Sequence, residues 1–189
     1  INGIECLVKS TDSLFIYNSE TKQLKKITEA TAISYACKNS DNVVWIGTWI
    51  GLIVGYNLTT NERYEFQIDS IQNSNIQIFA IEGDPDGSIW VGTVGEGLIH
   101  ITNPTSKNRQ FTQYNMKEKN DSNIPSNIVH CIYTDKQNKL WIGTNGDGII
   151  ILDKQTKHIQ NLTTKDGLLS NIIESITSDS EGNIWFSSS

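Results

Sequence analysis

The histidines, together with one glutamate that aligns with a histidine, are the candidates for acid–base chemistry in this sequence. The histidines are scattered along the chain: His100, His130 and His158. When the recurring segments are aligned, His130 and Glu174 occupy the same repeat position, which Ser34 and Phe79 hold in two other copies. A histidine beside a carboxylate could transfer protons in catalysis. A structural pair, or a water-bridged lining of a channel, explains the same alignment.

A second candidate site is the carboxylate pair in residues 84–88, Asp-Pro-Asp-Gly-Ser, which resembles the start of a calcium-binding loop. The related segment 135–139 lacks the second carboxylate, segment 179–183 has a glutamate in its place, and no glutamate follows to complete such a loop. Hairpin turns stabilised by an Asp or Asn side chain account for every copy. We therefore expect no bound metal, and nothing else in the sequence predicts a cofactor.

The cysteines are odd in number and far apart: Cys6, Cys37 and Cys131. No pair has the spacing of a metal site or of a redox motif. Each falls in a predicted strand, where a thiol behaves as a small hydrophobic side chain. We expect buried free thiols and no disulfide framework.

Charge and apolar content narrow the classes of partner. The 189 residues carry a formal net charge of −6, with 37% hydrophobic and 19% charged residues. Nucleic acids and anionic membranes attract clustered Lys and Arg, so this segment is not expected to bind either. No apolar run approaches the ~20 residues that a membrane span needs.

The segments that must position these residues recur along the chain. A stretch ending in Trp-Ile-Gly-Thr or a close variant is centred on four tryptophans, at spacings of 45, 51 and 44 residues: Trp45, Trp90, Trp141 and Trp185. Self-similarity at a period of this length indicates a repeat architecture.

Each period contains four short segments rich in Ile, Val, Tyr and Phe, which is typical of β-strands. The turn before each Trp strand has Asn or Gly at its second position, and these residues tolerate the positive φ of a tight hairpin: Asn42, Gly87, Asn138 and Gly182. A glycine also follows the Trp strand in three copies, at positions 51, 97 and 148. The turns predict antiparallel pairing within every repeat.

The Trp strand has apolar residues at consecutive positions, as in Ile89-Trp90-Val91, which indicates a strand covered on both faces. Four-stranded antiparallel sheets repeated every ~45 residues predict the blades of a β-propeller. We expect the tryptophans to fill the space between blades. We also expect the glycine two residues later to let the next blade approach closely: Gly47, Gly92 and Gly143.

The repeat predicts a single all-β array over the whole chain. Its blades are expected at 1–28 (partial), 29–67, 68–114, 115–162 and 163–189 (partial). Both ends of the chain fall on a Trp-type strand, so the two ends duplicate each other and do not complete one blade. We therefore expect a fragment of about four blades from a longer propeller, with exposed edges that favour dimerisation.

Ligand contacts in such a fold come from the loops on one rim. Four residues between the second and third strands of their repeats are candidates: Trp49, Glu96, Asn145 and Asp147. An indole near amide and carboxylate groups suits a sugar, because it stacks on the apolar face while the polar groups bond the hydroxyls. Packing of Trp49 on a neighbouring loop or blade is the alternative. The charged loop 115–125 is either a partner contact or a mobile insertion.

Residues 84–98 and 135–149 follow the pattern D-x-x-G-x-[IL]-W-[IV]-G-T-x-x-G-[GL]-L nearly position by position. In this the chain resembles the two-component regulator propeller family over practically its whole length. The first copy lacks the Trp, and the last replaces Ile-Gly-Thr with Phe-Ser-Ser. The resemblance implies a seven-bladed propeller in the periplasmic sensor region of a Bacteroidetes-type hybrid histidine kinase. It also implies a glycan-derived oligosaccharide as ligand, dimerisation, and a membrane tether in the full-length protein.

Two other functions are compatible with the sequence. Residues 180–186, Ser-Glu-Gly-Asn-Ile-Trp-Phe, resemble a repeat of streptogramin lyases, in which case His130 and Glu174 would meet in a solvent channel. A scaffold for other proteins is the third possibility, as many Trp-repeat propellers are scaffolds. The four copies together favour a non-enzymatic sensor module.

Overall fold

The computed structural model describes residues 5–68, 76–116 and 123–189, without the side chains of Glu5 and Cys6. Over these residues the chain forms seventeen β-strands and one short 3₁₀ helix, η1 (Thr164–Asp166). The predicted contact loop 115–125 lies partly outside the described residues. The side chain of Cys6 lies wholly outside them.

The strands form five antiparallel sheets in chain order. The first sheet contains β1 (Glu5–Lys9), β2 (Ser13–Asn18) and β3 (Gln23–Glu29). The second contains β4 (Ile33–Lys38), β5 (Val43–Thr48), β6 (Leu52–Asn57) and β7 (Arg63–Gln67). The third contains β8 (Gln77–Gly83), β9 (Ile89–Val94), β10 (Leu98–Thr102) and β11 (Gln110–Tyr114). The fourth contains β12 (Val129–Thr134), β13 (Lys139–Thr144), β14 (Ile149–Asp153) and β15 (Ile159–Leu162), and the fifth β16 (Ile173–Ser178) and β17 (Ile184–Ser188).

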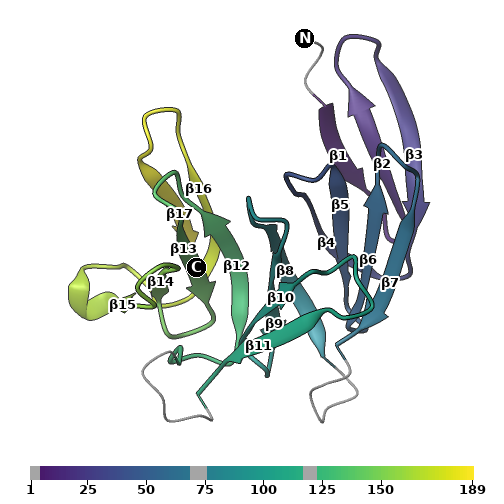
Figure 1. Ribbon diagram of the computed structural model, residues 1–189. Helices are drawn as coiled ribbons and strands as arrows, with labels where there is room; N and C mark the ends of the chain where they lie inside the picture. The colour runs from purple at the N-terminus through teal and green to yellow at the C-terminus, as the bar shows by residue number, and fades with distance from the viewer. Residues whose placement is uncertain (1–4, 69–75, 117–122) are drawn as a thin grey trace.

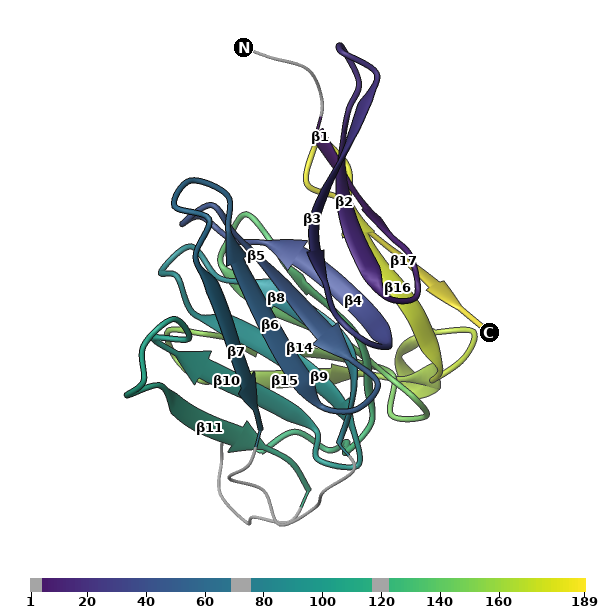
Figure 2. The same cartoon turned by 90° about the vertical axis from the view of Figure 1, so that its right-hand side faces the viewer.

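The sheets stand side by side in a fan (Figure 1). Strands β4, β8, β12 and β16 lie on its inner, concave side, and the last strands of the sheets lie outside. Successive inner strands contact one another. Turned by 90°, the β4–β7 sheet lies in front of the β8–β11 sheet (Figure 2). The predicted all-β fold of about four blades is confirmed.

Tight turns join the strands at the expected residues. The second position of each turn before a Trp strand has a positive φ: 61° at Asn42, 86° at Gly87, 62° at Asn138 and 92° at Gly182. The glycines after the Trp strands, at 51, 97 and 148, have φ values of 76°, 76° and 79°. Left-handed backbone is costly for most side chains, so Asn and Gly at these positions direct the chain into hairpins.

The core consists of four hydrophobic clusters, each between two successive sheets. Trp45 and Trp90 are 0% and 1% exposed and fill the spaces after the second and third sheets, as predicted. Trp185 is 61% exposed. Within the described residues no sheet follows β16–β17, so a place between two blades stays a prediction for this ring. Trp141 is half-buried, because the sheet beside it has two strands.

The glycines of the Trp-x-Gly segments allow close approach of the next sheet, as expected. A Cβ added at Gly47 would lie 2.4 Å from Ile78 Cγ2, and one at Gly92 would lie 2.6 Å from Val129 Cγ1. At Gly143 it would lie 2.8 Å from Ile173 Cγ2. These three contacting residues belong to the following sheet, and at Gly143 the Sγ of Cys131 in the same sheet is closer still. The repeat spacing therefore depends on the absence of a side chain here.

Candidate functional site

The Asp that opens three of the Trp motifs stabilises the hairpin. Asp135 Oδ1 accepts hydrogen bonds from the backbone N atoms of Gln137 and Lys139, at 2.9 and 2.8 Å, and Oδ2 accepts one from Trp141 Nε1 at 2.7 Å. Asp179 makes the same bonds in the last sheet. Hydrogen bonds from the Trp185 indole and from Asn183 lower the pKa of Asp179 to about 2. The Asp side chain therefore stabilises the turn by hydrogen bonds to its backbone, as in an Asx-stabilised hairpin.

The second sheet departs from this pattern because Asn39 replaces the Asp. Asn39 Oδ1 accepts hydrogen bonds from the backbone N atoms of Asp41 and Val43, both at 3.1 Å. The other terminal atom of Asn39 is an amide nitrogen, which donates and cannot accept from an indole. Trp45 Nε1 is accordingly buried without a hydrogen-bond partner. An unpaired buried donor of this kind costs about 1–3 kcal/mol.

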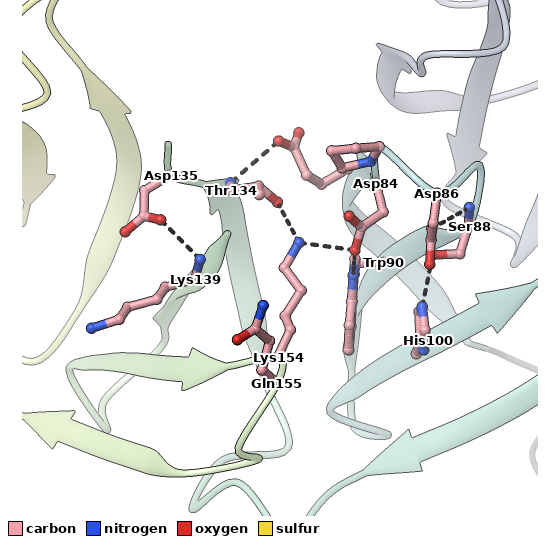
Figure 3. A network of polar contacts seen from close by, with 12 residues as sticks. Asp84, Asp86, Ser88, Trp90, His100, Thr134, Asp135, Lys139, Lys154 and Gln155 are labelled. Atoms are coloured by element: carbon pink, nitrogen blue, oxygen red, sulfur yellow. Dashed lines mark hydrogen bonds and ion pairs between the residues drawn. The ribbon is translucent and has the colours of Figure 1, made fainter. Parts of the chain in front are cut away.

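The same Asp position in the third sheet belongs to a polar cleft of about 520 Å³ between the β8–β11 and β12–β15 sheets. Lys154, just after β14, reaches across it to Asp84, with Nζ 2.9 Å from Oδ2 and both side chains 8% exposed. The same oxygen accepts a hydrogen bond from Trp90 Nε1 at 2.8 Å (Figure 3). A buried ion pair thus joins the third sheet to the fourth.

Glu82 lies beside this pair at the end of β8. Its Oε1 accepts a hydrogen bond from the backbone N of Thr134, at 3.3 Å, across the same boundary. Burial raises the pKa of Glu82 to about 7, although the Thr134 N–H and the charge of Lys154 oppose the rise. Glu82 is therefore partly protonated near neutral pH.

The third sheet also contains a hydrogen-bonded chain of Asp86, Ser88 and His100. Ser88 Oγ donates to Asp86 Oδ1 at 2.6 Å and lies 2.8 Å from His100 Nε2. The His100 ring stacks on Trp90, its cross-strand neighbour, with centroids 4.0 Å apart, and burial lowers its pKa. The serine donates to the carboxylate and stands between it and the imidazole, whereas in a nucleophilic triad the imidazole stands in the middle. These hydrogen bonds therefore differ in order from those of a nucleophilic triad.

The inner strands form a second candidate surface. Each contains a register shift against its partner at the same repeat position, and the extra residue there is, in order, Ser34, Phe79, His130 or Glu174. The residues that the alignment grouped are thus the β-bulges of four neighbouring strands. Bulges redirect side chains and are over-represented next to binding and active sites.

Three rings from three sheets lie in contact along these bulges. Trp49 meets Phe79 edge-on, with centroids 4.7 Å apart. Phe79 and His130 lie 5.4 Å apart. His130 and Glu174, which acid–base catalysis would require in contact, form no hydrogen bond with each other in the described structure. The predicted packing of Trp49 on the next blade is present, yet its side chain stays 43% exposed.

The other predicted ligand residues differ in exposure. Glu96 is buried, and Gln113 Nε2 donates to its Oε2 and to its backbone O, both at 2.9 Å. Asp147 is half-buried, and its backbone N donates to Thr144 Oγ1 at 3.0 Å. Asn145 is exposed and holds the same repeat position as Trp49, directly after the Thr of the Trp motif. A role in binding stays a prediction for all four.

The cysteines described are free and poorly reactive. Cys37 and Cys131 form no disulfide. Burial raises the pKa of Cys37, and it raises the pKa of Cys131 to about 12, so neither is a thiolate at neutral pH. In the part of the chain that the structure describes, no three His, Cys, Asp or Glu side chains group as metal ligands would. No helix among the same residues is long and apolar enough to cross a membrane.

Sequence reasoning missed the cleft residues Lys154 and Glu82. Neither belongs to the repeated motif, and an isolated lysine after a strand carries no signal for a partner 70 residues away. A glutamate on an inner strand, flanked by apolar residues, was the available hint for Glu82. Only the stacking of one sheet on the next brings these groups together.

Comparison with known proteins shows what the repeats resemble. A model described as "Two component regulator propeller" matches residues 70–95, 123–146 and 167–189. These three segments are similar to two-component regulator propeller repeats. The matched segments of these propeller repeats include the Trp motifs of the third, fourth and fifth sheets.

Relatives of the propeller repeats include Histidine kinase P4 of Formosa agariphila, 25% identical over 97% of this chain and 13% of the kinase. The extracellular domain of a hybrid two-component system of B. thetaiotaomicron has a TM-score of 0.73 and 20% identity, over 100% of this chain and 25% of the other. PorZ, a surface component of the type-IX secretion system of Porphyromonas gingivalis, has a TM-score of 0.69 and 19% identity, over 92% and 27%. The structural likenesses show the propeller fold, and the chain spans between 13% and 27% of the length of these proteins.

Proposed function

We propose that this chain is part of an extracytoplasmic sensor propeller of a hybrid two-component system, where it binds, or relays the binding of, a glycan-derived oligosaccharide. The observation that carries this proposal is the match of three Trp motifs to two-component regulator propellers, together with a histidine kinase relative that aligns over 97% of the chain. In the full-length protein the propeller is tethered to a membrane and its signal passes to a histidine kinase. Localisation to the periplasm is part of the same proposal.

The geometry supports a binding role over an enzymatic one. The candidate acid–base residues His130 and Glu174 are not hydrogen-bonded to each other. The only serine–histidine contact described, between Ser88 and His100, has the wrong order for nucleophilic catalysis. The exposed ring of Trp49 beside the half-buried rings of Phe79 and His130 is instead typical of a binding surface.

The test is direct binding of the purified chain to an array of neutral and acidic oligosaccharides, followed by calorimetric titration of any hits. Saturable binding of one saccharide class, with a Kd of about 1 mM or tighter, is the expected result. A chain that retains its β-sheet circular dichroism and binds none of the saccharides would contradict the oligosaccharide ligand. A reporter strain carrying the full-length protein would then show whether the sensor function survives without it.

A further inference from the structure

The four β-bulges create a surface that the fold alone does not require. A blade needs inner strands that pair with the Trp strand, and a regular strand would do so without a bulge. Here each inner strand inserts one extra residue at the same level. Ser34 is buried, whereas Phe79 and His130 are half-buried and Glu174 is exposed. Three of the four bulges therefore bring side chains to accessible positions on adjacent strands.

The loops after the Trp strands extend this surface at each end. Trp49 packs edge-on against Phe79 and remains 43% exposed, which is unusual for so large a ring. Asn145 occupies the equivalent position two sheets later and is exposed. It forms an antiparallel bridge with Ile172, two residues before Glu174. We call the set Trp49, Phe79, His130, Asn145 and Glu174 the inner arc.

The inner arc changes character along its length. At one end the rings of Trp49, Phe79 and His130 form a continuous row, with centroid separations of 4.7 and 5.4 Å. At the other end stand an amide, which both donates and accepts, and a carboxylate, which accepts. A ligand that matches this order has an apolar face at one end and several hydroxyls at the other. The net charge of −6 and Glu174 itself disfavour an anionic ligand.

We infer that the inner arc is the saccharide-binding site of this propeller and that it takes a neutral oligosaccharide of at least two rings. One ring stacks on the exposed face of Trp49, and the hydroxyls of the next are bound by Asn145 and Glu174. His130 lies between them and bonds a hydroxyl through a ring nitrogen. This inference rests on the proposed function, and it assigns that function to residues from four sheets.

The test compares variants of the arc with one matched control. Wild-type chain, Trp49→Ala, Asn145→Ala and Glu174→Gln are titrated calorimetrically with neutral hexaoses of glucose, xylose, mannose and galactose and with an acidic galacturonate hexamer. The control is Leu24→Ala, which alters an exposed apolar side chain of the first sheet, and this sheet contributes no residue to the arc. We expect a neutral hexaose to bind, Trp49→Ala to weaken binding at least ~10-fold and Asn145→Ala or Glu174→Gln by about 5-fold, with the control unchanged. Circular dichroism confirms that each variant is folded.

Each other outcome counts against the inference in a distinguishable way. If a hexaose binds and all three arc variants keep the wild-type Kd, the inner arc is not the site, while the proposed function stands. If only the galacturonate hexamer binds, the neutral ligand is wrong. If the folded wild-type chain binds no saccharide, the inference and the saccharide part of the proposed function both fail. Should Trp49→Ala not fold, the two polar variants decide, because both alter exposed side chains.

Discussion

At the scale of single residues, the structure separates the groups that stabilise the propeller from those that are free to bind a ligand. Asp135 and Asp179 each accept hydrogen bonds from two backbone N–H groups and an indole. Asp84 accepts one from the Trp90 indole and is paired with Lys154. Trp49 and Asn145, at one equivalent position, have no comparable role in their sheets and are exposed. The residues with the clearest sequence signal are therefore structural.

Lys154→Met tests the buried ion pair. Removing the cation leaves the carboxylate of Asp84 buried without its partner, so we expect a loss of about 3–5 kcal/mol in the free energy of unfolding. Adding Asp84→Asn should restore part of that loss, because it removes the unpaired charge. The matched control is Lys26→Met, whose exposed pair with Glu29 is worth about 0–1 kcal/mol. Urea unfolding measures all four proteins, and equal losses for the two lysines would contradict the assignment.

Glu82→Gln tests the raised pKa. The folded pKa of about 7 exceeds the ordinary value of 4.5, so between these values the folded state binds more protons than the unfolded state. The contribution of Glu82 to the free energy of unfolding is therefore largest at low pH. It falls by about 3 kcal/mol in total as the pH rises from 4.5 through 7. Gln keeps an oxygen for the Thr134 N–H and has no charge to bury.

The variant should therefore be more stable than wild type at about pH 8, with a difference that shrinks toward about pH 5. Chemical unfolding at several pH values measures this, with Glu20→Gln at an exposed position as control. A difference between wild type and Glu82→Gln that does not change with pH would refute the prediction.

At the scale of elements, the distance between sheets depends on glycine. Gly92 lies against Val129 of the next inner strand, with no room for a Cβ. Gly92→Ala should destabilise the chain by roughly 1–3 kcal/mol through overpacking. In the double variant with Val129→Ala the shorter neighbour makes room, so the combined loss should be smaller than the sum of the single losses. Strictly additive losses in thermal or urea unfolding would show that the two residues do not press on each other.

At the scale of the whole molecule, the last sheet presents an open face. Trp185 and Phe186 of β17 are both exposed there, whereas Trp45 and Trp90 are buried and Trp141 is half-buried. Large exposed apolar side chains on a sheet face favour association. In the isolated chain we expect these side chains to pair two copies, in line with the dimerisation that the sequence predicts.

Trp185→Ser combined with Phe186→Ser should accordingly shift the purified chain toward monomer in sedimentation velocity at tens of micromolar, roughly the range of weak interfaces. The control Val8→Ser alters an exposed apolar residue of the first sheet. Monomeric wild-type protein at these concentrations would exclude the dimer through this face.

The sequence by itself determined the local structure of this protein. The period of the Trp motif, the Asn or Gly in each turn and the consecutive apolar residues specify hairpins and blades, because these signals act over a few residues. It also grouped Ser34, Phe79, His130 and Glu174, although not as bulges. What only the tertiary structure decided is which side chains meet across sheets: Lys154 with Asp84, Glu82 with Thr134, Trp49 with Phe79. Such contacts depend on how one sheet stacks on the next, and partners 30 to 70 residues apart leave no periodic trace in the chain.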